Sequence, residues 1–149
     1  MMRHPLNKLL MEEIGLTVDS KNCVMDQDTR EPLLYGGKTL KYSSKYEIPI
    51  TDGDIKFDPA YNKNLMITLF QYYVNKLQEE DEIYVKGYSE VPHESGTSAL
   101  CVDMDDKRYC TNFYRNPTFK YIEMIQILNA GEVSVSLEQY DIMLEEIKK

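Results

Sequence analysis

One uninterrupted stretch of the sequence, Phe57–Leu77, decides where the core of this chain must lie. It reads FDPAYNKNLMITLFQYYVNKL, and no Gly or Pro follows Pro59 until Gly87. Asp58 is a suitable N-terminal cap, and proline is tolerated at the first helical position. Large residues recur at helical spacing on two adjacent stripes: Tyr61, Leu65, Leu69, Tyr72 and Lys76, and beside them Met66, Phe70, Tyr73 and Leu77. The pattern predicts a helix that is buried on more than one side.

The segments before this central helix predict a short helix and then β structure. Leucines at helical spacing predict a helix over Pro5–Ile14, with Gly15 as its left-handed cap. A terminal helix of this length is marginal alone, so residues 1–15 are expected to dock on a partner surface or on their own domain. Leu16–Ser44 reads as strands around a Gly36-Gly37 hairpin turn, and Tyr46–Ile50 as one more extended piece.

The segments after the central helix predict a strand, a hairpin and two helices. The acidic run Glu79–Glu82 opposes the helix dipole and should end the helix in solvent. The predicted elements that follow are a strand over Ile83–Val91, a loop over Pro92–Ser98, a hairpin of Ala99–Met104 with Tyr109–Tyr114, a helix over Pro117–Ala130 and a last helix from Ser136 to about Ile147.

Strands and helices do not alternate strictly, so the sequence predicts an α+β fold and not a doubly wound one. We expect a mainly antiparallel sheet of hairpins packed on the central helix, with two C-terminal helices and the short N-terminal one. The length of 149 residues is that of one domain, so residues 1–149 are predicted to form a single α+β domain.

The charge and the cysteine content narrow the class of protein. The net charge of -8 has the wrong sign for a protein that binds nucleic acid directly, because phosphate contacts require Lys and Arg. The start of the chain lacks a signal-peptide pattern, and no stretch approaches the ~20 apolar residues that span a bilayer. An odd number of cysteines, three, together with the missing signal peptide predicts free thiols in a reducing compartment. The missing apolar stretch predicts no contact with a membrane.

Two groups of carboxylates invite a metal interpretation. Asp103, Asp105 and Asp106 cluster at the predicted hairpin tip, where oxygen ligands can hold Mg²⁺ or Ca²⁺. The glycine and distal glutamate of a calcium loop are absent, and Lys107 and Arg108 follow directly. We therefore expect a solvated turn, and we assign no metal ligands.

A second group, Asp26, Asp28 and Glu31, is spaced in a similar way and lacks the same glycine. It too is expected to be a polar turn. The run Gly36–Thr39 resembles part of a phosphate-binding loop, but Pro32 stands where that motif requires glycine. No cofactor-binding residue is assigned.

Cys101 and Cys110 fall on the two strands of the second hairpin. If the loop is Asp105-Asp106 alone, the two cysteines face each other and can form a disulfide on oxidation. If the turn is Asp106-Lys107, they are out of register by two. A reduced pair is the favoured expectation, the spacing fits no zinc motif, and Cys23 is isolated.

His93 lies in the loop PHESGTS beside Glu94, Ser95 and Ser98. A Ser–His–acid set on a single short loop does not reach the geometry of a catalytic triad, and the GxSxG elbow is absent. We expect an exposed loop histidine, and no catalytic residue is assigned.

Three segments give the chain a resemblance to a class of viral proteins. They are Asp26–Thr29, Gly37–Tyr42 and the run from Phe57-Asp58-Pro59 through Leu65-Met66 to Leu69-Phe70. Together they cover about the middle third of the chain. In these segments it resembles small structural proteins of tailed bacteriophages, such as auxiliary head, neck or tail components. The resemblance implies no catalytic residue.

The resulting expectation is a non-enzymatic virion structural or assembly component that works through protein–protein contacts. Its partners are predicted to be other virion or assembly proteins, in multiple copies, and its location the virion after synthesis in the host cytoplasm, or else the cytoplasm. Pro5–Ile14 and the PHESGTS loop are the predicted contact elements.

Two other function classes stay open. One is an acidic inhibitor that mimics nucleic acid towards a basic partner, with Glu79–Glu82, Asp103, Asp105 and Asp106 as its charged array. The other is an enzyme that uses Asp103, Asp105 or His93 with a metal ion.

Overall fold

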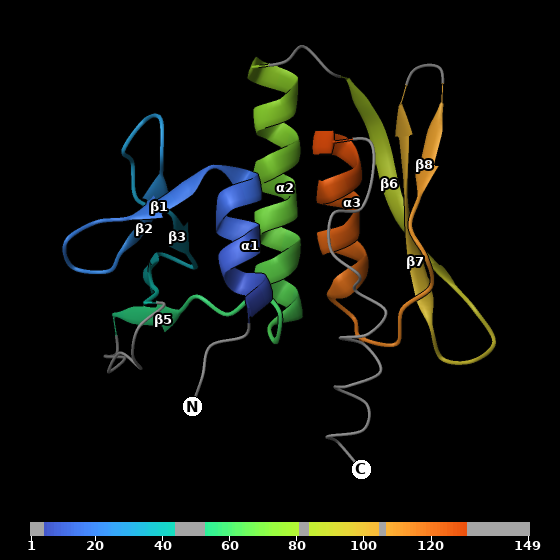
Figure 1. Ribbon diagram of the computed structural model, residues 1–149, viewed down its shortest axis with the longest axis horizontal. Helices are drawn as coiled ribbons and strands as arrows, with labels where there is room; N and C mark the ends of the chain where they lie inside the picture. The colour runs from blue at the N-terminus through green and yellow to red at the C-terminus, as the bar shows by residue number, and fades with distance from the viewer. Residues whose placement is uncertain (1–4, 44–52, 81–83, 105–106, 131–149) are drawn as a thin grey trace. The chain divides into compact units, whose positions relative to one another are not determined.

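The computed structural model describes residues 5–43, 53–80, 84–104 and 107–130 (Figure 1). Within these residues the fold is α+β, as the sequence predicts. The helices are α1 (Pro5–Ile14), α2 (Lys63–Glu80) and α3 (Phe119–Ala130). The predicted strand Tyr46–Ile50 and the predicted last helix, Ser136 to Ile147, lie outside the described residues. No described helix combines the length and the apolar character that crossing a membrane requires.

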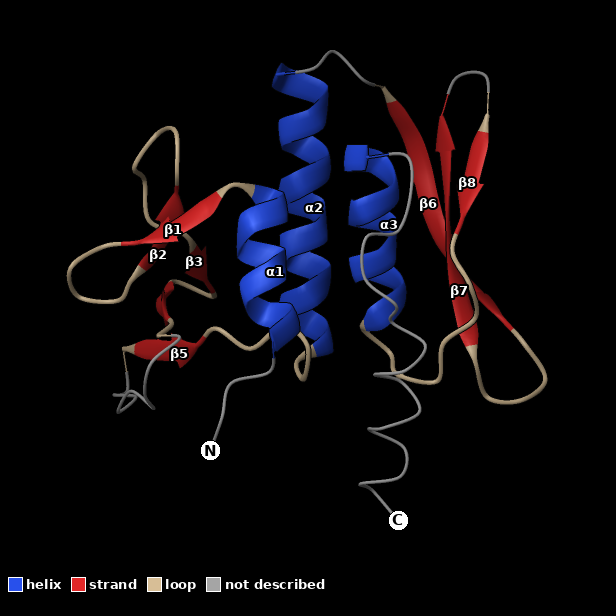
Figure 2. Cartoon of the chain, viewed as in Figure 1, coloured by secondary structure: helices blue, strands red, loops and turns tan. Residues whose placement is uncertain are grey.

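The described strands form small sheets (Figure 2). β1 (Leu16–Val18) pairs with β2 (Val24–Asp26), β3 (Leu34–Tyr35) and β5 (Asp54–Lys56) flank β4 (Lys38–Lys41), and β6 (Val85–Pro92) and β8 (Arg108–Cys110) flank β7 (Ser98–Met104). The pairing is mainly antiparallel, which confirms the prediction. One pair differs, since β4 and β5 run parallel. Local hairpin rules do not predict this pair, because a parallel pair needs a longer connection.

The chain divides into two compact units, residues 1–68 and residues 69–149. The boundary falls inside α2, so this helix supplies its first turns to one unit and its remaining turns to the other. The expectation of a single domain over residues 1–149 stays a prediction.

In the first unit, α1 matches its predicted bounds. Gly15 adopts a φ of 86°, and its N–H donates to the carbonyl of Met11 at 3.1 Å, which closes the helix with the expected left-handed residue. Leu6 and Leu10 are fully buried. Asn7 lies on the same face and is also buried, and its amide bonds to the Asp58 carboxylate and to the Ala60 N–H, both in the segment before α2.

The hairpin of β3 and β4 also follows the prediction. Gly36 and Gly37 have φ values of 59° and 79°, the left-handed conformations that a two-residue hairpin turn needs. Leu40 and Tyr42 point to one side, and both are buried. The ring of Tyr42 packs edge-on against Phe57, with 5.9 Å between centroids, so the strand and the start of the central stretch share one core.

The predicted start of the central helix is wrong by several residues. Asp58 does not cap it, since its carboxylate accepts a hydrogen bond from the Asn7 amide at 2.6 Å. The helix begins at Lys63, and Asn62 is the cap, because its side-chain oxygen accepts from the N–H of Leu65 at 3.2 Å. Tyr61 therefore precedes the helix and is 58% exposed.

In the second unit the later turns of α2 face β6 and α3. The ring of Phe70 is fully buried and packs edge-on against Tyr88 at 4.9 Å and Tyr121 at 5.3 Å. Burial raises the pKa of Tyr88, whose hydroxyl donates to Gln71 at 2.7 Å. The hydroxyl of Tyr73 donates to the side chain of Asn129 on α3.

The strand after α2 starts later than predicted. β6 begins at Val85, and the register with β7 shifts between Val85 and Gly87, so a bulge interrupts the simple alternation of faces. From Tyr88 onward the alternation is regular. Tyr88 lies opposite the buried Val102, on the face of the sheet that α3 covers.

Candidate functional site

Cys101 and Cys110 are joined by a disulfide, which corrects the expectation of a reduced pair. The Met104 N–H donates to the Lys107 carbonyl at 2.9 Å, so the loop is the two-residue one. Hydrogen-bonded and non-hydrogen-bonded pairs alternate along an antiparallel ladder. Met104–Lys107 and Leu100–Thr111 are hydrogen-bonded pairs, so Cys101 and Cys110 form a non-hydrogen-bonded pair, in which the facing Cα atoms come closest. Their Cα atoms are 4.2 Å apart.

The acidic tip of this hairpin is only partly described. Asp103 forms an ion pair with Arg108 at 3.2 Å across the strands, while Asp105 and Asp106 lie outside the described residues. In the described part of the chain, no three His, Cys, Asp or Glu side chains gather as a metal site. The acidic array proposed to bind a basic partner (Glu79–Glu82, Asp103, Asp105 and Asp106) stays a prediction. Arg108 neutralises one of its carboxylates, that of Asp103.

The first carboxylate group organises a turn. Asp26 is buried, and its Oδ1 accepts hydrogen bonds from the N–H groups of Asp28 at 2.8 Å and Thr29 at 3.1 Å. The carboxylate oxygen thereby fixes the tight connection out of β2. Asp28 and Glu31 are exposed beside it, so the expectation of a polar turn is confirmed for these residues.

The third cysteine lies in the first unit beside two charged groups. Backbone N–H groups of Cys23 and Lys21 donate to Asp19 and lower the pKa of that carboxyl, the Cys23 bond most strongly. A hydrogen bond with the Cys23 side chain raises the pKa of Lys41. Cys23 itself is half-buried and free of any disulfide.

The PHESGTS loop is ordered by its own hydrogen bonds. The N–H of His93 donates to the Thr97 carbonyl at 2.9 Å, and the N–H of Gly96 donates to the His93 carbonyl at 3.3 Å. His93 is exposed, as predicted, and its ring packs against Phe113 with 4.7 Å between centroids. Phe113 is 47% exposed. We call Phe113 together with residues 93–97 the hairpin-end surface.

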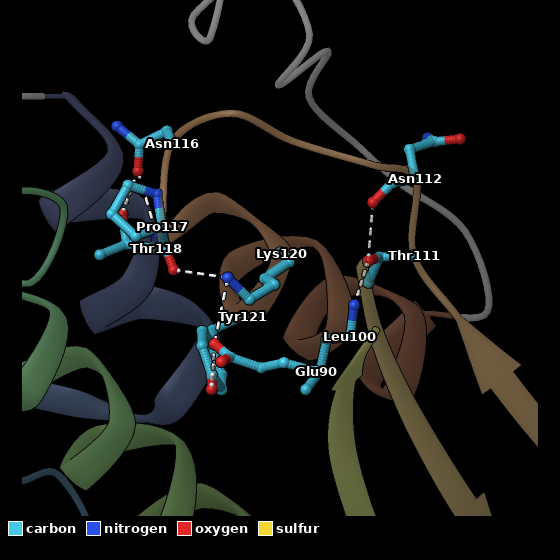
Figure 3. Close-up of polar contacts among 9 residues, drawn as sticks. All are labelled: Glu90, Leu100, Thr111, Asn112, Asn116, Pro117, Thr118, Lys120 and Tyr121. Atoms are coloured by element: carbon cyan, nitrogen blue, oxygen red, sulfur yellow. Dashed lines mark hydrogen bonds and ion pairs between the residues drawn. The ribbon is translucent and has the colours of Figure 1, made fainter. Parts of the chain in front are cut away.

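A charged cluster around the buried Lys120 connects β6 to α3 (Figure 3). The side chain of Lys120 is 1% exposed, and its Nζ lies 3.1 Å from Glu90 Oε1 and donates to the Pro117 carbonyl at 3.0 Å. The hydroxyl of Tyr121 donates to the same Glu90 oxygen at 2.9 Å. Burial, and next the bond to Glu90, raises the pKa of Tyr121. One carboxylate thus tethers two side chains of the helix to the sheet.

A second set of polar contacts fixes the start of α3 (Figure 3). Asn116 Oδ1 accepts from the backbone N–H of Thr118 at 2.9 Å and from its hydroxyl at 2.7 Å, which forms an Asx turn leading into the helix. Upstream, the Thr111 hydroxyl accepts from the Leu100 N–H and donates to the Asn112 carbonyl, both at 2.9 Å.

Glu123 is a buried carboxylate of α3. Its Oε1 accepts from the backbone N–H and the side-chain amide of Asn112, at 3.3 and 3.2 Å, and its Oε2 accepts from the buried Tyr114 hydroxyl. These bonds hold the segment after β8 against the helix. The arrangement is that of a structural clamp, since each oxygen is already committed to the protein itself.

Sequence reasoning missed these clusters. The signal for them is the composition of α3, where apolar residues occur on every face, so that Lys120, Glu123 and Gln126 have to be buried with them. Which residue pairs with each of them depends on the sheet register, and the sequence did not determine that register.

A small hollow lies elsewhere in the second unit. Its volume is about 250 Å³, and it is lined by Leu77, Met104, Lys107, Tyr109, Ile127 and Leu128. The volume is below the range of about 300–1,000 Å³ typical of ligand pockets. We therefore assign no ligand to it.

Comparison with known proteins does not identify a relative: no family model, curated protein or solved structure matches this chain significantly.

Proposed function

We propose that this chain is a non-enzymatic component of a virion, or of the assembly that builds one, and that it acts through protein–protein contacts. It is made in the host cytoplasm and binds other proteins of the same assembly. The observation that carries the proposal is the hairpin-end surface, where the ring of the exposed Phe113 packs against His93 beside a hydrogen-bonded loop.

Two physical features suit this surface to binding. Aromatic side chains are enriched at the centres of protein interfaces, because they bury a large apolar area with few rotatable bonds. The loop over residues 93–97 is also held in place before any partner arrives, by its bonds between His93, Gly96 and Thr97. Binding to a preorganised surface avoids part of the entropy cost of ordering a loop.

The test is co-expression with the structural proteins encoded beside this chain, followed by purification of the complexes and measurement of affinity. Phe113→Ala is expected to weaken binding by at least about tenfold, the typical effect of removing an aromatic residue from an interface centre. Tyr84→Ala is the matched control, because Tyr84 is also an exposed aromatic residue of the second unit, at 58% exposure, and it lies outside the surface. The control should bind like the unaltered chain.

Two results contradict the proposal. One is a strict monomer that binds none of the co-encoded proteins. The other is binding that is unaffected by Phe113→Ala and disappears as salt is added, since an apolar contact depends only weakly on ionic strength. The second result would support the acidic-inhibitor function instead.

A further inference from the structure

The disulfide lies on the face of its sheet that points away from α3. Ser89, Cys101 and Cys110 form one rung across β6, β7 and β8, and the next rung on each side belongs to the opposite face. That opposite face carries Leu100, which is fully buried, and Glu90, which bonds to α3. Ser89 and Cys110 are exposed, so the rung with the disulfide borders solvent.

The two sulfur-bearing residues differ in accessibility. Cys101 is 5% exposed, whereas Cys110 belongs to the exposed class. A thiolate arriving from solvent can reach Cys110, and Cys101 then becomes the leaving group. The bond is therefore open to attack at one of its two ends.

The hairpin does not depend on the disulfide for its pairing. Backbone hydrogen bonds of 2.9 Å lie on both sides of the rung, from Met104 to Lys107 and from Thr111 to Leu100. Val102, between them, is fully buried. The bond can consequently open and close while the two strands remain paired.

We propose that the Cys101–Cys110 disulfide is a site of reversible thiol–disulfide exchange with a dithiol reductant, and that Cys110 is the residue attacked. A thiolate of the reductant attacks Cys110 Sγ, a mixed disulfide forms, and Cys101 leaves as a thiolate that takes a proton from water. The second thiolate of the reductant then attacks the reductant sulfur that is bonded to Cys110. Cys110 is released as a thiolate and protonated, the reductant becomes a disulfide, and two electrons have passed to the protein.

The test uses the full chain with Cys23→Ser, so that Cys101 and Cys110 are the remaining cysteines. The protein is treated briefly with reduced glutathione, a monothiol, and acid then traps the mixed disulfide before Cys101 or a second glutathione displaces it. The remaining free thiol is alkylated with N-ethylmaleimide, and both adducts are mapped by mass spectrometry. We expect glutathione on Cys110 and the maleimide on Cys101, with an unchanged circular dichroism spectrum. Dithiothreitol should then reduce the pair completely without denaturant.

Glutathione on Cys101, a bond that dithiothreitol reduces only in urea, or cysteines that are already free before any thiol is added would each overturn the proposal. A second experiment compares two variants that each keep one of these cysteines, so it does not depend on the Cys101–Cys110 disulfide. In the Cys23→Ser background, Cys101→Ser leaves Cys110 as the single thiol, and Cys110→Ser leaves Cys101. Cys110 should react with oxidised glutathione at least about tenfold faster, because a buried thiol is inert. Equal rates in two folded variants would contradict the assignment of Cys110.

Discussion

Asn7 is fully buried, and both ends of its side-chain amide bond to the turn before α2. It donates to Asp58 at 2.6 Å and accepts from the Ala60 N–H at 3.1 Å. Asn7→Leu removes both hydrogen bonds of a buried amide, so the free energy of unfolding should fall by about 1–3 kcal/mol. Urea denaturation measures the change. Asn64→Leu, at an exposed asparagine, should stay within about 0.5 kcal/mol of the unaltered chain.

The ion pair between Lys120 and Glu90 is asymmetric, because the side chains are 1% and 37% exposed. Glu90→Gln removes the countercharge from a buried ammonium, and we expect it to lower the free energy of unfolding by about 1–3 kcal/mol. Lys120→Met should lower it less, because Glu90 can be hydrated and methionine fills the space of the lysine stem. Equilibrium unfolding of both variants gives the order, and a larger loss for Lys120→Met would contradict this account.

Tyr121 predicts a dependence of stability on alkaline pH. Its pKa is raised in the folded chain, chiefly by burial, so the folded state favours the neutral phenol. The unfolded chain ionises near the ordinary tyrosine value of about 10. The stabilisation is therefore fully present below about pH 10 and declines as the pH rises further. Stability should decrease more steeply above that pH in the unaltered chain than in Tyr121→Phe. Parallel curves from urea unfolding would exclude the effect.

At the scale of elements, the start of α2 can be tested with one chemical change at two positions. Asn62 caps the helix through the Leu65 N–H, whereas Asn64 is an exposed residue two positions further on. Asn62→Ala should lower the free energy of unfolding by about 1 kcal/mol. Asn64→Ala should leave it unchanged or raise it by a few tenths, because Asn64 is an exposed residue of the first turn and alanine has the higher helix propensity. A loss at Asn64 and none at Asn62 would place the helix start elsewhere.

The elements that sequence patterns predict correctly are those specified by neighbours in the chain. Gly15 ends α1 and Gly36-Gly37 turns the first hairpin, because both require left-handed backbone that glycine adopts freely. The errors come from distant residues. Asp58 has the chemistry of a cap, but Asn7 occupies its carboxylate, and the cap function passes to Asn62.

The disulfide shows the same limit. The sequence offered two registers for the second hairpin, and the choice between them decides whether Cys101 and Cys110 meet. The structure selects the two-residue loop, with Cys101 opposite Cys110 and Asp103 opposite Arg108. Composition favours reduced thiols in a chain of this kind, but it carries no information on register.

At the scale of the whole molecule, the sequence pointed to one half of the hairpin-end surface. The PHESGTS loop was predicted as a contact element from its position and polarity. Phe113 was not, because the sequence predicts a strand over Tyr109–Tyr114 that includes it, whereas β8 ends at Cys110. The contact between His93 and Phe113 depends on the register shift that follows β8, where Ser98 pairs with Tyr114.

Hydroxyl-radical footprinting of the free chain and of the assembled particle tests the proposed function most directly. We expect oxidation of Phe113 and of the peptide 92–98 to fall sharply on assembly, while the exposed Tyr84 remains as reactive as in the free chain. If Phe113 is oxidised equally in both states, or if the chain is absent from purified particles, the assignment as a virion or assembly component is contradicted.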